Sequence, residues 1–182
     1  MRFTLVDRIV DLQPGRAITT VKCLSLAEEY LSDHFPRFPV MPGVLMLEAM
    51  TQAGAWLVRV SENFAHSVVV LKEARNVKYA DFVVPGQVLT VQAEIVKSEA
   101  RVTQLKARGT VGDKVAVSGR LVLERFNLAE RGAQWAVTDE NIKRRMKEML
   151  SLLCQSAATD DSAAGGGRGV AEPVRTVPAD AN

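Results

Sequence analysis

The sequence predicts an α+β domain in which an antiparallel sheet covers one buried helix. Residues 44–60 are apolar around most of a helical circumference, and such a helix is normally buried. The segments that follow are rich in β-branched residues, and the clearest one alternates apolar and polar side chains with the period of a strand. These strand segments are residues 67–71, 76–79, 88–96, 102–110 and 115–126. A helix followed by long antiparallel strands favours one sheet packed on one helix, although the pattern does not fix the strand order.

The first part of the chain predicts a hairpin and a stiff loop. Residues 3–12 and 16–24 are rich in Val, Ile and Thr, and the turn dipeptide Pro14-Gly15 separates them. Residues 34–42 contain three prolines, which remove backbone donors and hold the preceding residues extended. The loop therefore leads rigidly into the buried helix.

The C-terminal part predicts one more helix and then a tail. Thr138 is a suitable cap, and the apolar face of this helix consists of Ile142, Met146, Met149, Leu150 and Leu153. Beyond it, Ala, Asp, Gly, Pro and Ser offer too little apolar area to offset the entropy of ordering. We expect a domain at 1–127, a linker and amphipathic helix at 128–154, and a disordered tail at 155–182.

Composition excludes several functional classes. The chain has 182 residues, with 23 Lys and Arg against 21 Asp and Glu and no long basic run, so we expect no nucleic-acid partner. It has no signal-like start and no apolar stretch of membrane-spanning length. Cys23 and Cys154 are expected to be free thiols, which favours a cytoplasmic protein. No metal-ligand cluster or phosphate loop occurs, so no metal or cofactor is implied.

Two residues suit proton transfer. His34 lies in the stiff loop, and Glu48 lies fourteen positions later among apolar neighbours on the helix. An imidazole can take a proton near neutral pH, and burial favours the neutral acid form of a carboxyl group. On the residues alone, His34 could instead be a structural hydrogen-bonder, and Glu48 could face solvent or a subunit seam. Gly43, at the expected helix start, could offer its N–H to an oxygen that gains charge or could be a plain turn glycine.

Longer motifs surround these residues. They are His-Phe-Pro at residues 34–36, Pro-Val-Met-Pro-Gly-Val-Leu at 39–45, and Leu-Glu-Ala-Met at 47–50 followed by Gln52. Together they resemble the signature of the hotdog-fold β-hydroxyacyl-acyl-carrier-protein dehydratases of the non-isomerising type, over roughly residues 4–127. The resemblance implies a hotdog domain with a long central helix wrapped by an antiparallel sheet. It also implies a homodimer, or a trimer of dimers, with sites at the subunit interface.

The resemblance assigns a role to each motif residue. His34 and Glu48 are the catalytic pair and come from different protomers, and the Gly43 N–H polarises the thioester carbonyl. Gln52, one turn beyond Glu48, is expected to orient the carboxyl group. The implied reaction removes water from a (3R)-hydroxyacyl thioester on an acyl carrier protein and leaves a trans-2-enoyl thioester, without a cofactor.

Three positions depart from the family pattern and leave an alternative open. Asp33 and Arg37 stand where the family usually has glycine, so a loop geometry that needs positive φ could differ. Gln87 stands where aspartate is usual. The alternative is a hotdog acyl-thioester-binding protein that is non-catalytic or of the thioesterase type. An acidic carrier protein could be drawn by basic residues, namely Arg37, Arg59, Lys72, Arg75 and Lys78.

Overall fold

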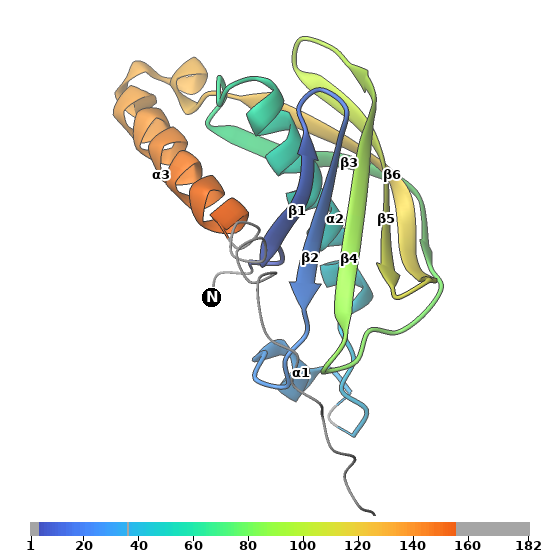
Figure 1. Ribbon diagram of the computed structural model, residues 1–182. Helices are drawn as coiled ribbons and strands as arrows, with labels where there is room; N and C mark the ends of the chain where they lie inside the picture. The colour runs from blue at the N-terminus through green and yellow to red at the C-terminus, as the bar shows by residue number, and fades with distance from the viewer. Residues whose placement is uncertain (1–3, 36, 156–182) are drawn as a thin grey trace, which may run out of the picture.

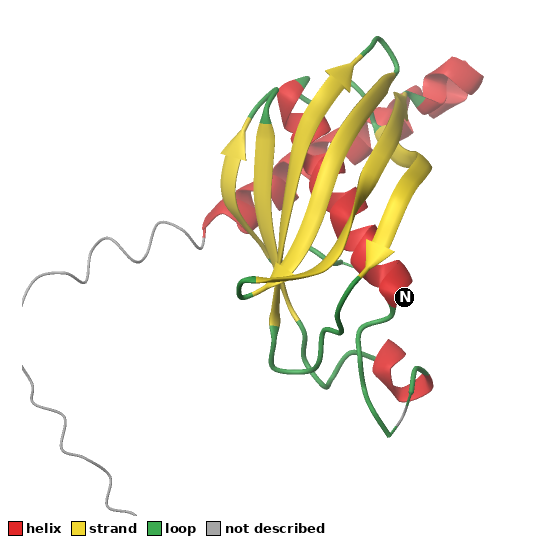
Figure 2. Cartoon of the chain, turned by 90° about the vertical axis from the view of Figure 1, so that its right-hand side faces the viewer, coloured by secondary structure: helices red, strands yellow, loops and turns green. Residues whose placement is uncertain are grey.

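The chain folds as a six-stranded antiparallel sheet wrapped around one long helix (Figures 1 and 2). The computed structural model describes residues 4–35 and 37–155. The strands are β1 (Arg8–Gln13), β2 (Ala17–Cys23), β3 (Val68–Tyr79), β4 (Val88–Ser98), β5 (Val102–Val111) and β6 (Lys114–Phe126). The helices are α1 (Tyr30–Asp33), α2 (Gly43–Ser61), α3 (Ala136–Gln155) and the short 3-10 turns η1 (Leu128–Arg131) and η2 (Ala133–Trp135). The strand order is β1-β2-β4-β5-β6-β3, and the predicted α+β hotdog architecture is confirmed.

The central helix is buried where it meets the sheet. Ala49, Met50, Ala53 and Leu57 are completely buried on α2. At Gly54 a Cβ atom would lie 3.2 Å from Cδ1 of Leu123, so the missing side chain lets the sheet approach the helix backbone. Glycine is unfavourable inside a helix by about 1 kcal/mol relative to alanine, and here that weakness is offset by close packing.

One strand is longer than the sequence predicts. The expected segments 67–71 and 76–79 belong to a single strand, β3, which pairs with β6. The register shifts between Leu71 and Glu73 and again between Arg75 and Lys78. β-Bulges of this kind interrupt the alternation of side chains without ending the strand, and for that reason the pattern looks broken. β3 also lies at an edge of the sheet, where one side of its backbone pairs with no strand of the described residues.

A buried ion cluster fixes the base of the β1–β2 hairpin. The Nζ atom of Lys22, which is 6 % exposed, lies 2.6 Å from Glu28 Oε1 and 3.4 Å from Asp7 Oδ1. Asp7 also accepts a hydrogen bond from the Cys23 N–H at 2.6 Å. A buried charge is tolerated when it is paired in this way. The cluster ties the hairpin to the segment that leads into α1 and the following loop.

The C-terminal helix is anchored through an aspartate. Asp139, buried in the first turn of α3, accepts hydrogen bonds from the Ser67 hydroxyl and from the Leu128 and Ala129 N–H groups. Burial disfavours its charged form, but these donors outweigh burial and hold the pKa of Asp139 below its usual value. The helix begins at Ala136, so the prediction that Thr138 caps it is wrong: the chain enters the helix from η2 two residues earlier.

The apolar face of α3 packs as predicted at most positions. Leu153 is buried, and Met146 and Leu150 are partly buried against the core, whereas Met149 is 38 % exposed. Figure 1 shows α3 outside the sheet, beside β1. The predicted tail lies outside the described residues from position 156 onward. In the described part of the chain no helix is long and apolar enough to cross a membrane.

Candidate active site

His34 follows directly after α1 and is half-buried. Its ring centroid lies 4.5 Å from that of Phe35, whose backbone takes the left-handed conformation with φ 50°. Asp33 is the last residue of α1 and therefore has helical geometry. The left-handed residue of this turn is thus Phe35, so aspartate at position 33 fits the loop without strain.

Gly43 begins α2 immediately after Pro42. The first N–H groups of an α-helix have no partner within the helix and carry the positive end of its dipole. A Cβ atom at Gly43 would lie 3.1 Å from two ring atoms of Tyr79, so glycine allows this ring to pack against the helix start. His34, Gly43, Tyr79 and Phe82 line one cavity of about 300 Å³.

Glu48 is half-buried on the next turn of α2 and lies in a different cavity. This second cavity, of about 480 Å³, lies between α2 and α3. Gln52 donates from Nε2 to Glu48 Oε1 at 2.9 Å, and Gln52 Oε1 accepts the N–H of Leu5 at 2.9 Å. Because the amide is held at both ends, its N–H₂ group is directed at the carboxyl group of Glu48.

The four predicted site residues fall into two groups, which we call half-sites. The structure groups His34 with Gly43, and Glu48 with Gln52, but it places the two pairs in separate cavities. Proton transfer from both groups to one substrate needs them on opposite sides of the same reacting carbons. In one protomer these two groups line different cavities.

Aromatic side chains form an exposed surface around the His34 cavity. Phe35, Phe38 and Phe82 are 59 %, 55 % and 60 % exposed, and Tyr79 beside them is half exposed. The rings of Phe38 and Phe82 meet edge to face with centroids 5.7 Å apart. Grouped aromatic residues on a surface commonly mark a contact with another molecule.

Gln87, where the family usually has aspartate, stabilises the turn that precedes β4. Its side-chain Oε1 accepts the N–H of Val84 at 2.9 Å across the turn formed by Pro85 and Gly86. The backbone carbonyl of Gln87 accepts the Leu24 N–H, also at 2.9 Å. Gln87 therefore closes the turn and ties it to the end of β2, which a shorter acidic side chain could also do through its carboxylate.

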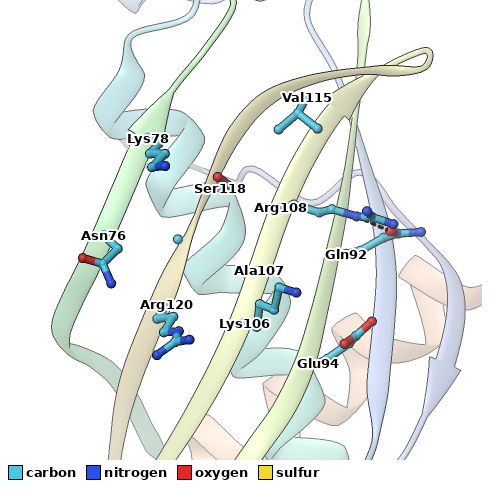
Figure 3. A pocket seen from close by; sticks show the side chains of 11 residues that line it. Asn76, Lys78, Gln92, Glu94, Lys106, Ala107, Arg108, Val115, Ser118 and Arg120 are labelled. Carbon is cyan, nitrogen blue, oxygen red and sulfur yellow. Dashed lines mark hydrogen bonds between the residues drawn. The ribbon is translucent and has the colours of Figure 1, made fainter.

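The basic residues considered for an acidic partner fall into separate groups. Arg75 pairs with Glu73 and Lys72 with Glu124. Lys78 instead lines a cavity of about 460 Å³ on the outer face of the sheet. Figure 3 shows α2 behind the strands that line this cavity. The other charged residues there are Glu94, Lys106, Arg108 and Arg120. The sheet separates this basic cavity from α2 and its half-site.

Arg59 has a different environment from these surface residues. It lines the same cavity as Glu48, together with Trp56 on α2 and Met146 on α3. The sequence signal for this position is its spacing from Glu48, because eleven residues, or about three turns, return to nearly the same face of a helix. The contribution of α3 had no such signal, since an amphipathic pattern does not say what the helix packs against.

Comparison with known proteins agrees with this architecture. A FabA-like domain matches residues 1–120. The chain is 40% identical over 119 residues to the 3-hydroxyacyl-[acyl-carrier-protein] dehydratase FabZ of Ruminiclostridium cellulolyticum, covering 65% of this chain and 84% of that protein. It is 40% identical over 129 residues to the protein of the same name from Variovorax paradoxus, covering 66% and 82%.

Solved structures share the fold at low sequence identity. The dehydratase heterocomplex ApeI:P from Xenorhabdus doucetiae matches with a TM-score of 0.59 and 19% identity, over 73% of this chain and 90% of that chain. The smu.793 protein of Streptococcus mutans, bound to acetyl CoA, matches with a TM-score of 0.54 and 12% identity, over 70% and 94%. The chain therefore belongs to the FabA-like family of hotdog-fold proteins. Within that family it groups with the FabZ-type 3-hydroxyacyl-[acyl-carrier-protein] dehydratases.

Proposed function

We infer that the protein dehydrates (3R)-hydroxyacyl thioesters carried by an acyl carrier protein to trans-2-enoyl thioesters, a step of fatty acid or related lipid biosynthesis. The observation that carries this proposal is the pair of complementary half-sites in one chain. In one half-site the base His34 lies beside Gly43 at the N-terminus of α2. In the other, the acid Glu48 accepts a hydrogen bond from the Gln52 amide. Its relatives bear the name of this activity.

The half-sites account for each step of the reaction. The thioester carbonyl accepts a hydrogen bond from the Gly43 N–H, which stabilises negative charge on the oxygen as C2 loses its proton. His34 takes that proton, the C2–C3 double bond forms, and the C3 hydroxyl leaves with a proton from Glu48 as water. His34 is then protonated and Glu48 ionised, and proton exchange with solvent restores both. Gln52 keeps the Glu48 carboxyl group aimed at the hydroxyl.

We propose that the complete site forms in a homodimer or in a trimer of dimers. In it, His34 and Gly43 of one protomer meet Glu48 and Gln52 of the other. Two features of the single chain support this assembly: the exposed aromatic surface around His34, and the long edge strand β3 with one free side. A second copy would bury aromatic rings that a monomer leaves in water.

The carrier protein and the location of the enzyme belong to the same proposal. The carrier is expected to deliver its acyl group at the His34 loop, where the exposed Arg37 offers a positive charge to an acidic partner. The free thiols of Cys23 and Cys154 fit a reducing compartment, so we place the protein in the cytoplasm.

A hydration assay on crotonyl thioesters of coenzyme A or carrier protein tests the activity. The proposal predicts loss of the enoyl absorbance with no release of free thiol, because water adds across the double bond. Release of free thiol would instead indicate a thioesterase. Binding without either change would indicate a non-catalytic acyl-thioester-binding protein.

A further inference from the structure

The cavity between α2 and α3 has polar groups at two separated places. Glu48 and Arg59 both line it, and α2 carries them eleven residues apart. At a rise of 1.5 Å per residue, that spacing corresponds to about 16 Å along the helix axis. The cavity therefore extends well beyond the carboxyl group that we assign to catalysis.

Between these two positions the lining is largely apolar. Ala55 and Trp56 contribute from α2 and Val69 from β3, while Met146 and Met149 contribute from α3. The wall formed by α3 is held in place, because Asp139 bonds Ser67 just beyond the end of α2. This helix lies outside the FabA-like match at residues 1–120.

Within the described residues, Arg59 forms no ion pair with a carboxylate. Its side chain is partly buried, and its Nε atom is buried without a hydrogen-bond acceptor. The centroid of the Trp56 ring lies 5.8 Å from the guanidinium carbon of Arg59. Burial lowers the pKa of Arg59 to about 10. A partly desolvated charge is stabilised by a ligand that supplies a hydrogen-bond acceptor, so this position suits an anionic group.

We propose that Arg59 binds the far end of the acyl chain, and that the preferred substrates are acyl thioesters whose terminal carbon carries a carboxylate rather than a methyl group. This rests on the proposed dehydratase function and names its substrate class. A carboxylate matches a guanidinium because two N–H groups can donate to its two oxygens in one plane. The apolar wall accommodates the methylene chain, and Glu48 acts at the thioester end.

The fit of charges within the cavity favours this substrate. Glu48 is the one acidic residue among the described residues that line the cavity. Its carboxyl group accepts a hydrogen bond from Gln52 and lies about three turns from Arg59 along α2. Arg145 of α3 also lines the cavity and is exposed at its rim, so it adds a second positive charge. The cavity is thus positive away from Glu48 and would attract an anionic chain end.

The test compares two medium-chain trans-2-enoyl thioesters of coenzyme A with equal chain length, one ending in a carboxylate and one in a methyl group. Purified full-length protein is expected to hydrate the carboxylate substrate with kcat/KM at least about tenfold higher, since a charge-assisted hydrogen bond is worth that factor or more. Arg59→Met should bring the ratio close to one, and Arg59→Lys should restore part of it. Arg108→Met, on the outer face of the sheet, is the matched control and should leave the ratio unchanged.

Two results would overturn the proposal. Equal kcat/KM for the two substrates with the unsubstituted protein would mean that Arg59 pairs with something other than substrate. An Arg59→Met variant that loses activity equally on both substrates would show a structural role. Either result can occur while crotonyl thioester is still hydrated, whereas failure of the dehydratase function itself would abolish crotonyl hydration too.

Discussion

The Nε2 atom of Gln52 donates to Oε1 of Glu48 at 2.9 Å, one helical turn away. The other end of the amide accepts the backbone N–H of Leu5, so the N-terminal segment fixes which way the amide points. A carboxyl group on a flexible side chain is thereby limited to few orientations. Proton transfer depends on such positioning, because the donor must lie within hydrogen-bond reach of the leaving oxygen.

Replacing Gln52 by alanine should lower kcat for crotonyl hydration by about tenfold, because Glu48 keeps its acid group but loses its orientation. The fold should survive at a cost of about 1 kcal/mol, the usual contribution of one hydrogen bond. The measurements are steady-state kinetics and urea unfolding.

Ser61→Ala is the matched control for this variant. Ser61 Oγ accepts the Gly15 N–H at 2.7 Å, so it also ties a loop backbone to α2, but at the opposite end from Glu48. It should cost similar stability without loss of kcat. Equal kinetic losses in the two variants would show that Gln52 acts only through folding.

Replacing Asp139 by asparagine should lower the free energy of unfolding at pH 7 by about 1 to 3 kcal/mol, because a buried carboxylate accepts three hydrogen bonds there. The pKa of Asp139 is lowered in the folded state. Its contribution is therefore present above the ordinary aspartate pKa of about 3.9 and is lost as the pH falls through the lower folded value.

Urea unfolding at several pH values checks this linkage. The stability difference between Asp139→Asn and the unsubstituted protein should shrink as the pH falls below about 4. Glu140→Gln, at the exposed neighbouring position, is the control and should change stability little. A difference that stays constant down to acidic pH would mean that the charge of Asp139 is not what anchors α3.

A chain that ends at Gln155 should unfold and turn over like the full-length protein, because the described helices and strands all lie within it. A chain that ends before Asp139 should be less stable by several kcal/mol, since it loses the buried Leu153 and the anchor to Ser67. Thermal unfolding and the hydration assay measure both effects. Insolubility of the first truncation would contradict the expectation for residues 156–182.

The sequence predicts an element well where its apolar pattern directly reflects how that element is buried. The helix from Gly43 was predicted within one residue at its start, because its apolar composition reflects burial on most sides. The pattern failed at β3, where two bulges break the alternation of an otherwise continuous strand. It also failed at Thr138, because a capping residue type does not guarantee that the preceding turn lies outside the helix.

The motif identifies the candidate site residues, but it does not predict how they are arranged in space. His34, Gly43, Glu48 and Gln52 stood out through their motif, yet spacing along a chain cannot say that two of them line a different cavity from the other two. The hydrogen bond between Gln52 and Glu48 follows from a spacing of four residues on a helix. The wall contributed by α3 depends on the tertiary position of that helix, which no local pattern encodes.

Each catalytic residue should be necessary on its own. His34→Ala and Glu48→Gln are each expected to lower kcat by at least about 10², the smaller end of the contribution of a positioned base or acid. The double variant should lose much less than the product of the two factors, because the groups act as a unit. Circular dichroism should show that all three proteins are folded. Full activity in either single variant would remove that residue from the mechanism.

Mixing the two inactive single variants under conditions of subunit exchange tests the shared site most directly. In a heterodimer, one of the two sites receives native His34 from one protomer and native Glu48 from the other, so crotonyl hydration should return in part. The fraction of heterodimer can be measured by native mass spectrometry, and activity should rise in proportion to it. Heterodimer that forms and stays inactive would contradict a site built from both protomers.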